Sequence, residues 1–196
     1  LLAVAAFVAV LAVNAAAESP IKLSLFDSIA WPKPEKTNVV LGLIDNNTPE
    51  VAGVSLNFFS SRVESLAGFS FGSLFVKSSE LRGVQFGLLN MSEDVQGWTS
   101  GLVNYNTGKF TGLETGLVNW NMGKFTGVQF GLVNWDTDKV TGVQFGAFNR
   151  AESLSGVQFG VVNYIEKIDT GLQIGLVNII RHHGWLPVMI IANGRF

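Results

Sequence analysis

Hydrophobic and polar residues alternate along most of this chain, and the alternation recurs every 14 or 15 residues. The clearest copies lie within residues 83–178 and contain Gly-Val-Gln-Phe-Gly-Leu-Val-Asn or a close variant of it. Weaker copies occupy residues 38–82. Strict alternation is typical of β-strands, and a fixed period of this length indicates a repeat architecture. The pattern predicts an all-β protein with one strand and one turn in each copy.

Short polar segments separate the predicted strands. Asn106-Thr107-Gly108-Lys109 is one of them, and Asp136-Thr137-Asp138-Lys139 is another. An Asn or Asp followed two residues later by Gly suits a type I turn closed by a glycine bulge, which joins antiparallel strands. The turn chemistry therefore predicts that neighbouring strands are antiparallel.

Each predicted strand has one polar and one apolar face. Polar side chains recur at one position of the copies, namely Gln85, Thr99, Glu114, Gln129, Gln144, Gln158 and Gln173. The other face stacks the apolar residues Leu56, Phe71, Phe86, Phe130, Phe145, Phe159 and Ile174. Aromatic residues gather at the strand ends, namely Tyr105, Phe110, Trp120, Phe125, Trp135 and Tyr164.

These features favour an up-and-down antiparallel β-barrel of about 12 strands in a membrane, because such barrels face lipid with apolar residues and their lumen with polar ones. The polar row would then face the lumen, and the strand-end aromatics would lie at the two membrane interfaces. Residues 185–196 would form the closing strand, paired with the first one.

A β-solenoid built from 15-residue coils is the alternative architecture. In it the Val-Phe-Leu rows would stack inside, and the recurring Asn would form a hydrogen-bonded ladder. The near identity of the copies favours this alternative, since strands of an up-and-down barrel alternate in direction. A solenoid would leave the side chains of Trp120 and Trp135 exposed to solvent, and this weighs against the solenoid.

The chain begins with an apolar run over residues 1–13, followed by Ala15-Ala16-Ala17. An apolar run of this length before a small-x-small site is typical of a secretory signal peptide, and it is shorter than the about 20 residues that a membrane-spanning helix needs. We expect residues 1–17 to be a signal peptide and residues 18–196 to form a single β-repeat domain.

Composition narrows the function. The chain has no cysteine, a formal net charge of −2 and 14% charged residues. These values exclude a disulfide framework or thiolate metal site and give no basic stripe for nucleic acid. No nucleophile–base–acid motif and no phosphate-binding loop occurs. We therefore expect no enzyme activity, no catalytic residue and no cofactor.

Three polar groups are weak candidates for a site. His182 and His183 could bind a metal, but a solvated turn explains them as well. Glu114 is the single acid in the polar row, and it could set cation preference in a lumen or be a solvated inward side chain. Asp136 and Asp138 could suggest a calcium turn, yet the ligand set of known calcium loops is lacking. We expect no metal site.

The repeated Gly-Val-Gln-Phe-Gly-Leu-Val-Asn, the opening Ser19–Phe26 and the end Gly184–Phe196 together resemble a family of bacterial surface-repeat proteins. The early copies depart from the pattern, with Asn57 in place of Gly. The resemblance implies an exported protein of the outer membrane or cell surface, with the lipid bilayer as partner, and it brings no catalytic residues. We predict a structural or passive channel role, or alternatively a soluble or surface-attached solenoid that acts as a binding module.

Overall fold

The computed structural model describes residues 19–196, and these residues form β-strands and turns without any helix. They divide into two compact units, of which unit 1 ends at Gly97 and unit 2 spans Trp98–Phe196. The predicted signal peptide lies outside the described residues. In the described part of the chain, no helix is long and apolar enough to cross a membrane.

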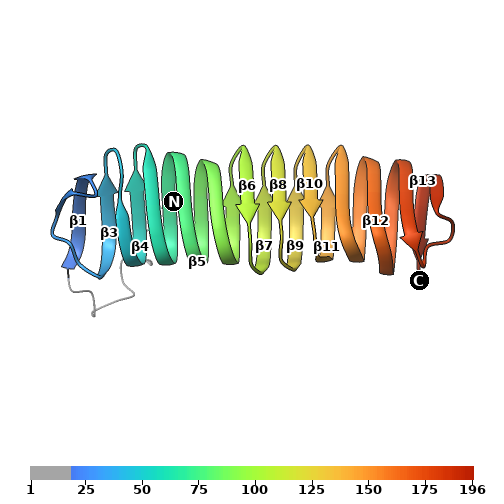
Figure 1. Cartoon of the computed structure of the whole chain (residues 1–196), viewed down its shortest axis with the longest axis horizontal. Coiled ribbons are helices and arrows are strands. Elements are labelled where there is room, and N and C mark those ends of the chain that lie inside the picture. The colour runs from blue at the N-terminus through green and yellow to red at the C-terminus, as the bar shows by residue number, and fades with distance from the viewer. Residues whose placement is uncertain (1–18) are drawn as a thin grey trace, which may run out of the picture. The chain divides into compact units, whose positions relative to one another are not determined.

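Unit 1 is a β-solenoid of parallel coils (Figure 1). Its strands are β1 (Ser19–Phe26), β2 (Ile29–Trp31), β3 (Lys36–Gly42), β4 (Asn47–Asn57) and the first part of β5 (Ser60–Ser100). β1 pairs with β3, β3 with β4 and β4 with β5, all in parallel. Only β2 runs against its neighbour, because it folds back on β1 as a short antiparallel strand.

Unit 2 has the same architecture, with two strands in each coil. One row of parallel strands contains β6 (Val103–Asn106), β8 (Val118–Asn121) and β10 (Val133–Asp136). The other contains β7 (Phe110–Thr115), β9 (Phe125–Phe130) and β11 (Lys139–Phe145). Both rows continue into the winding strand β12 (Phe148–His182), on which β13 (Val188–Arg195) pairs in the antiparallel direction.

The predicted antiparallel barrel is therefore wrong, and the alternative, a solenoid with coils of about 15 residues, is confirmed. The polar turns do not reverse the chain into hairpins. They lead it from one row of strands into the next coil, so that Asn134 lies beside Asn119 and Gln144 beside Gln129. This parallel register places identical amides side by side in successive coils, where each can donate to the next and accept from the one before, and these hydrogen bonds favour the coil over the hairpin.

The two faces of the strands are reversed relative to the solenoid that we expected. Gln129 and Asn134 are fully buried, whereas Phe130 and Leu132 are exposed. The interior of unit 2 contains a Gln row that includes Gln129 and Gln144, and an Asn row that includes Asn119 and Asn134. Beside them lie the polar column Asn106, Asn121 and Asp136 and the buried apolar residues Phe110, Phe125, Val140, Ala151, Leu154, Ile165, Ile168 and Ile180. The prediction that the Val-Phe-Leu rows stack inside is wrong, because the buried amides satisfy one another there.

The two glycines of each copy have different structural reasons. Gly127 has a φ of 139°, and a Cβ there would lie 1.8 Å from the carbonyl oxygen of Gly112. Gly131 has ordinary backbone angles, but a Cβ there would lie 2.7 Å from the side-chain amides of Asn119 and Asn134. The first glycine permits the backbone conformation of the strand, and the second makes room for the Asn row.

Candidate functional site

The corner between the two strand rows of unit 2 forms an apolar edge. Each coil places an aliphatic residue there, namely Leu102, Leu117, Leu132, Ala147, Val161 and Leu176. Leu132 is 58% exposed and Leu176 is 69% exposed. We call this row the Leu edge. Monomeric soluble proteins rarely expose contiguous apolar surface, so a row of this kind indicates an interaction surface.

Aromatic residues border the Leu edge on both sides. On one side, Phe145 stacks between Phe130 and Phe159 with ring centroids 4.8 and 5.0 Å apart and interplanar angles of 5°. On the other side lie Trp120 and Trp135, both exposed. The apolar surface therefore extends from the corner onto both strand rows.

The opposite corner of the coils is polar. It contains the turns between β6 and β7, β8 and β9, and β10 and β11, with the exposed polar residues Thr107, Lys109, Lys124 and Thr137 and one exposed apolar residue, Met122. Thr111 and Thr126 are exposed on the adjoining strands. Unit 2 is thus amphipathic: one corner of its coils is polar, and the other, the Leu edge, is apolar and poorly solvated by water.

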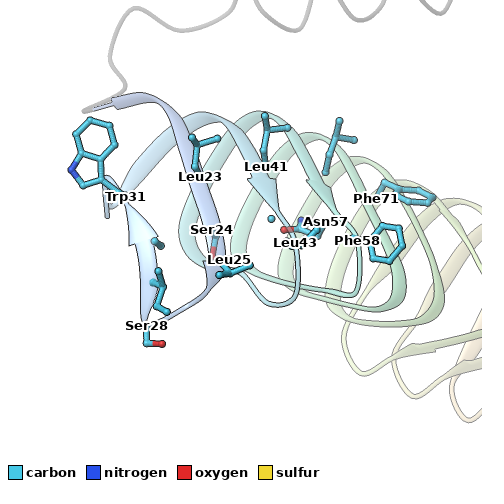
Figure 2. A pocket seen from close by; sticks show the side chains of 14 residues that line it. Leu23, Ser24, Leu25, Ser28, Trp31, Leu41, Leu43, Asn57, Phe58 and Phe71 are labelled. Carbon is cyan, nitrogen blue, oxygen red and sulfur yellow. The ribbon is translucent and has the colours of Figure 1, made fainter.

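Unit 1 has a groove of about 950 Å³ in the same part of the coil. Figure 2 shows Leu23, Leu41 and Phe71 in one row along it, and Leu43 and Phe58 beside them. The first row lies in register along β1, β3, β4 and β5. The groove therefore results from the stacking of the two coil positions that Phe130 and Leu132 occupy in unit 2.

The short strand β2 forms a wall of this groove. Ile29, Ala30 and Trp31 line it, and Trp31 is 79% exposed. Of the described residues that line the groove, none is charged, and the polar ones are Ser24, Ser28 and Asn57. An apolar lining with few polar groups is typical of a site for an apolar ligand or side chain.

The interior of unit 2 contains a continuous Asn ladder, as the sequence predicted for a solenoid. Asn119 Nδ2 donates to Asn134 Oδ1 at 2.8 Å and to the Phe130 carbonyl oxygen at 3.0 Å. The same pattern links Asn104 to Asn119, Asn134 to Asn149, Asn149 to Asn163 and Asn163 to Asn178. Buried amides are stable when they are hydrogen-bonded, so this ladder can replace an apolar core.

A second ladder runs along the Gln row and ends on an acid. Gln173 donates to Gln158, Gln158 to Gln144 and Gln144 to Gln129, at 2.6–2.8 Å. Gln129 Nε2 then donates to Glu114 Oε2 at 3.0 Å. Glu114 is fully buried. Its carboxyl group therefore faces neither a lumen nor solvent, and the expectation of a solvated side chain is wrong.

Asp136 of β10 is a second buried acid close to Glu114. Gln129 Nε2 also contacts Asp136 Oδ1 at 3.2 Å, so one amide bridges both carboxyl groups. Burial raises the pKa of Glu114 to about 7. Burial, and then the charge of Glu114, raise the pKa of Asp136 well above its usual range. Two buried carboxyl groups in contact with the same amide form a proton-binding cluster.

Because the fold has no barrel, the predicted lumen-facing row has no lumen to face. Gln85 lies inside unit 1, and Thr99, Glu114, Gln129, Gln144, Gln158 and Gln173 lie inside unit 2. The prediction of interface aromatics is wrong for Phe110 and Phe125, which are buried and stacked 5.0 Å apart. Tyr105, Trp120, Trp135 and Tyr164 point outward, and for them a membrane interface stays a prediction.

The other candidates lie apart from these sites. His182 and His183 are exposed at the end of β12, and His182 Nε2 lies 3.6 Å from Glu166 Oε1. Asp138 accepts a hydrogen bond from the Lys139 backbone N–H at 2.7 Å, while Asp136 points inside. Within residues 19–196, no group of three or more His, Cys, Asp or Glu residues is placed to hold a metal ion.

Sequence reasoning missed two features. It assigned Asp136 to a turn, although the register of Asn106, Asn121 and Asp136 at the same position of successive copies could have placed it in a stacked column. It also missed the groove, because Trp31 comes from a strand outside the repeat. Comparison of the chain with models of known protein families, with curated proteins and with solved structures gave no match.

Proposed function

We propose that this protein is a binding module that uses the apolar side of its coils to hold an apolar partner or ligand. The observation that supports the proposal most is the groove of unit 1, because an uncharged lining with a volume of about 950 Å³ is a preformed apolar site. The Leu edge of unit 2 offers a second apolar surface of the same composition. Export to the cell surface, predicted from the sequence, belongs to this proposal.

The groove can be tested by introducing a charge into it. Phe58 is exposed and lines the groove, so Phe58→Asp should leave the interior of the coils intact. We expect an uncharged, environment-sensitive apolar dye to bind the unmodified chain saturably, with at least about tenfold weaker binding to Phe58→Asp, since a carboxylate must be desolvated by an apolar ligand. The measurement is a fluorescence titration.

The matched control is Gln96→Asp, which adds the same side chain at an exposed position of unit 1 outside the groove. This variant should bind the dye as the unmodified chain does. Equal binding by Phe58→Asp and Gln96→Asp would mean that the groove holds no apolar ligand. Circular dichroism of both variants shows whether the β-structure is retained.

A lipid bilayer is the second candidate partner, and the observation that favours it is the aromatic row beside the Leu edge. Tyr105, Trp120, Trp135 and Tyr164 occupy one position of the coil, next to the buried Asn ladder. Tyr and Trp are enriched where proteins cross from hydrocarbon to water. A solenoid that inserts only its Leu edge would place these rings at that boundary.

A further inference from the structure

The two oxygens of Glu114 have different surroundings inside unit 2. Oε2 accepts hydrogen bonds from Asn121 Nδ2 at 2.7 Å and from Gln129 Nε2 at 3.0 Å. Oε1 is buried and has no hydrogen-bond partner. A buried polar atom without a partner costs free energy, so Oε1 requires an explanation.

Asn121 shows the complementary arrangement. Its Nδ2 donates to Glu114 Oε2, and its Oδ1 is buried without a partner. A carboxylic acid and a primary amide can join through two parallel hydrogen bonds, in which the amide N–H donates to one carboxyl oxygen and the acid O–H donates to the amide oxygen. The observed bond is one half of this pair, and Glu114 Oε1 and Asn121 Oδ1 are the atoms that the other half would join.

We propose that Glu114 binds a proton on Oε1 and donates it to Asn121 Oδ1, so that this acid–amide pair is a pH-sensitive switch inside unit 2. When the proton passes to water, the O–H···O bond is lost and two acceptor oxygens face each other. Glu114 is then an anion surrounded by protein rather than by water, which weakens the coil that contains it.

The charged groups around Glu114 support this assignment. Asp136 of β10 accepts from Gln129 at Oδ1 and from Gln144 at Oδ2, the latter at 2.6 Å, so both of its oxygens have donors, unlike Glu114 Oε1. Asn121 is a further hydrogen-bond partner of Asp136, and burial, then the charge of an ionised Glu114, raise the pKa of Asp136 as well, so the two acids are coupled. Arg150 of β12 donates to the Asp136 carbonyl oxygen at 3.1 Å, and its guanidinium lies 4.8 Å from the centroid of the Trp135 ring.

The remaining described strands that pack around the pair bring no further charge to it. β6, β8, β9 and the part of β5 that belongs to unit 2, Trp98–Ser100, contain no Asp, Glu, Lys or Arg, and β7 contains Glu114 alone. Tyr105 of β6 points outward to Met122, and Lys139 of β11 pairs with Asp169 at 2.8 Å. If only one of Glu114 and Asp136 is ionised, Arg150 is the cation near its charge. If both are ionised, no second cation among the described residues lies near the pair. The pKa of about 7 for Glu114, raised by burial, agrees with a proton held near neutral pH.

The variant Glu114→Gln tests the switch, because Gln places an N–H where the acid would carry its proton and extends the Gln row by one member. In urea unfolding of the full chain, we expect the unfolding equilibrium constant to rise by roughly a hundredfold or more between about pH 4.5 and 8. Glu114→Gln should make this rise smaller, because it removes one buried acid and also the charge that raises the pKa of Asp136, and it should be the more stable protein at pH 8.

Asp136→Asn is the matched control, since it neutralises the neighbouring acid and extends the Asn106–Asn121 column. This variant should keep a rise of the unfolding constant with pH. If Asp136→Asn removes the rise and Glu114→Gln does not, the proton belongs to Asp136 and the proposal is overturned.

The protonation of Glu114 can also be measured directly by NMR in the folded protein, without unfolding any variant. The carboxyl carbon resonance of Glu114 in the ¹³C NMR spectrum should change in the neutral pH range, and Glu114→Gln identifies it by its absence. A resonance that already has the position of an ionised carboxylate at about pH 5 would overturn the proposal.

Discussion

At the scale of residues, the interior is stabilised by amides that each have a defined role as donor and acceptor. The Asn ladder donates toward the C-terminal coils, from Asn104 on, and the Gln ladder donates in the opposite direction, from Gln173 to Glu114. Each ladder needs an acceptor at its end. Glu114 supplies that acceptor for the Gln ladder, which gives a structural reason for an acid at this position of the row.

Asn134 is the residue at which the contribution of the ladder can be measured. Asn134→Leu keeps a side chain of similar size but leaves Asn119 Nδ2 and Asn149 Oδ1 each without a ladder partner. Because buried polar groups that lose their partners cost about 1–3 kcal/mol each, we expect a loss of about 2–5 kcal/mol in unfolding free energy. Chemical denaturation followed by circular dichroism gives this value.

Thr126→Ala is the control for Asn134→Leu, because Thr126 is exposed on β9 in the same region of unit 2. Exposed substitutions of this kind change stability by less than about 0.5 kcal/mol. If Asn134→Leu were as stable as Thr126→Ala, apolar packing could replace the ladder, and the amides would not explain the fold.

At the scale of elements, the last strand protects the open end of unit 2. β13 reverses direction and pairs with β12 from Gly171↔Arg195 to Ile179↔Val188. Asn193 lies beside Gln173 and is fully buried, so it also covers the end of the polar interior. An unpaired strand edge is a template for association with another chain, and an antiparallel strand that differs from the repeat blocks further stacking.

Removal of residues 185–196 should therefore cause association rather than simple unfolding. The deletion exposes the N–H and C=O groups of β12 and the buried Gln173. We expect the shortened chain to form higher-order species at concentrations where the full chain is monodisperse, as measured by analytical ultracentrifugation. A shortened chain that sediments as the full chain does would show that β13 has no capping role.

At the scale of the whole molecule, each unit departs from an ordinary globular domain by burying rows of polar residues beside its apolar core. Each unit buries amides and exposes aliphatic and aromatic rows on one side of its coils. With 14% charged residues and a net charge of −2, the surface has little charge to compensate for these rows. Contiguous exposed apolar surface is typical of an interaction site, which is the physical basis of the proposed binding function.

The double variant Leu117→Glu/Leu132→Glu tests whether the Leu edge of unit 2 binds lipid. Both residues are more than half exposed, so the interior ladders should be unaffected. If the edge inserts into a bilayer, the fraction of protein that floats with phosphatidylcholine vesicles should fall at least about tenfold, because two buried Leu side chains contribute about 3 kcal/mol or more.

The control for this pair is Thr111→Glu/Thr126→Glu, which places the same charges on the polar part of unit 2. It should float as the unmodified chain does. If the unmodified chain does not float with vesicles at all, the lipid candidate is wrong, and a protein or small apolar ligand becomes the partner to seek.

Much of the fold follows from the sequence, and the parts that do not have identifiable reasons. The 15-residue period and the strands were predictable from the sequence, and the Asn ladder was predicted for the solenoid alternative, because stacked copies of a repeated Asn can donate to one another. The antiparallel direction was predicted wrongly from turn chemistry, since Asn106–Lys109 fits a hairpin and a coil corner alike. The groove was not predictable, because it requires β2 to fold back beside β1.

The sequence by itself determined which residues share a face of the strand, since alternation along an extended backbone fixes that for Gln129 and Phe130 whatever the architecture. Only the tertiary structure decided which face is inside. Apolar burial favours the Phe face, but the Gln and Asn faces can each form a complete hydrogen-bonded ladder in parallel register, and the small coil has room for one set. The same choice placed Glu114 in the interior and the Leu edge in contact with solvent.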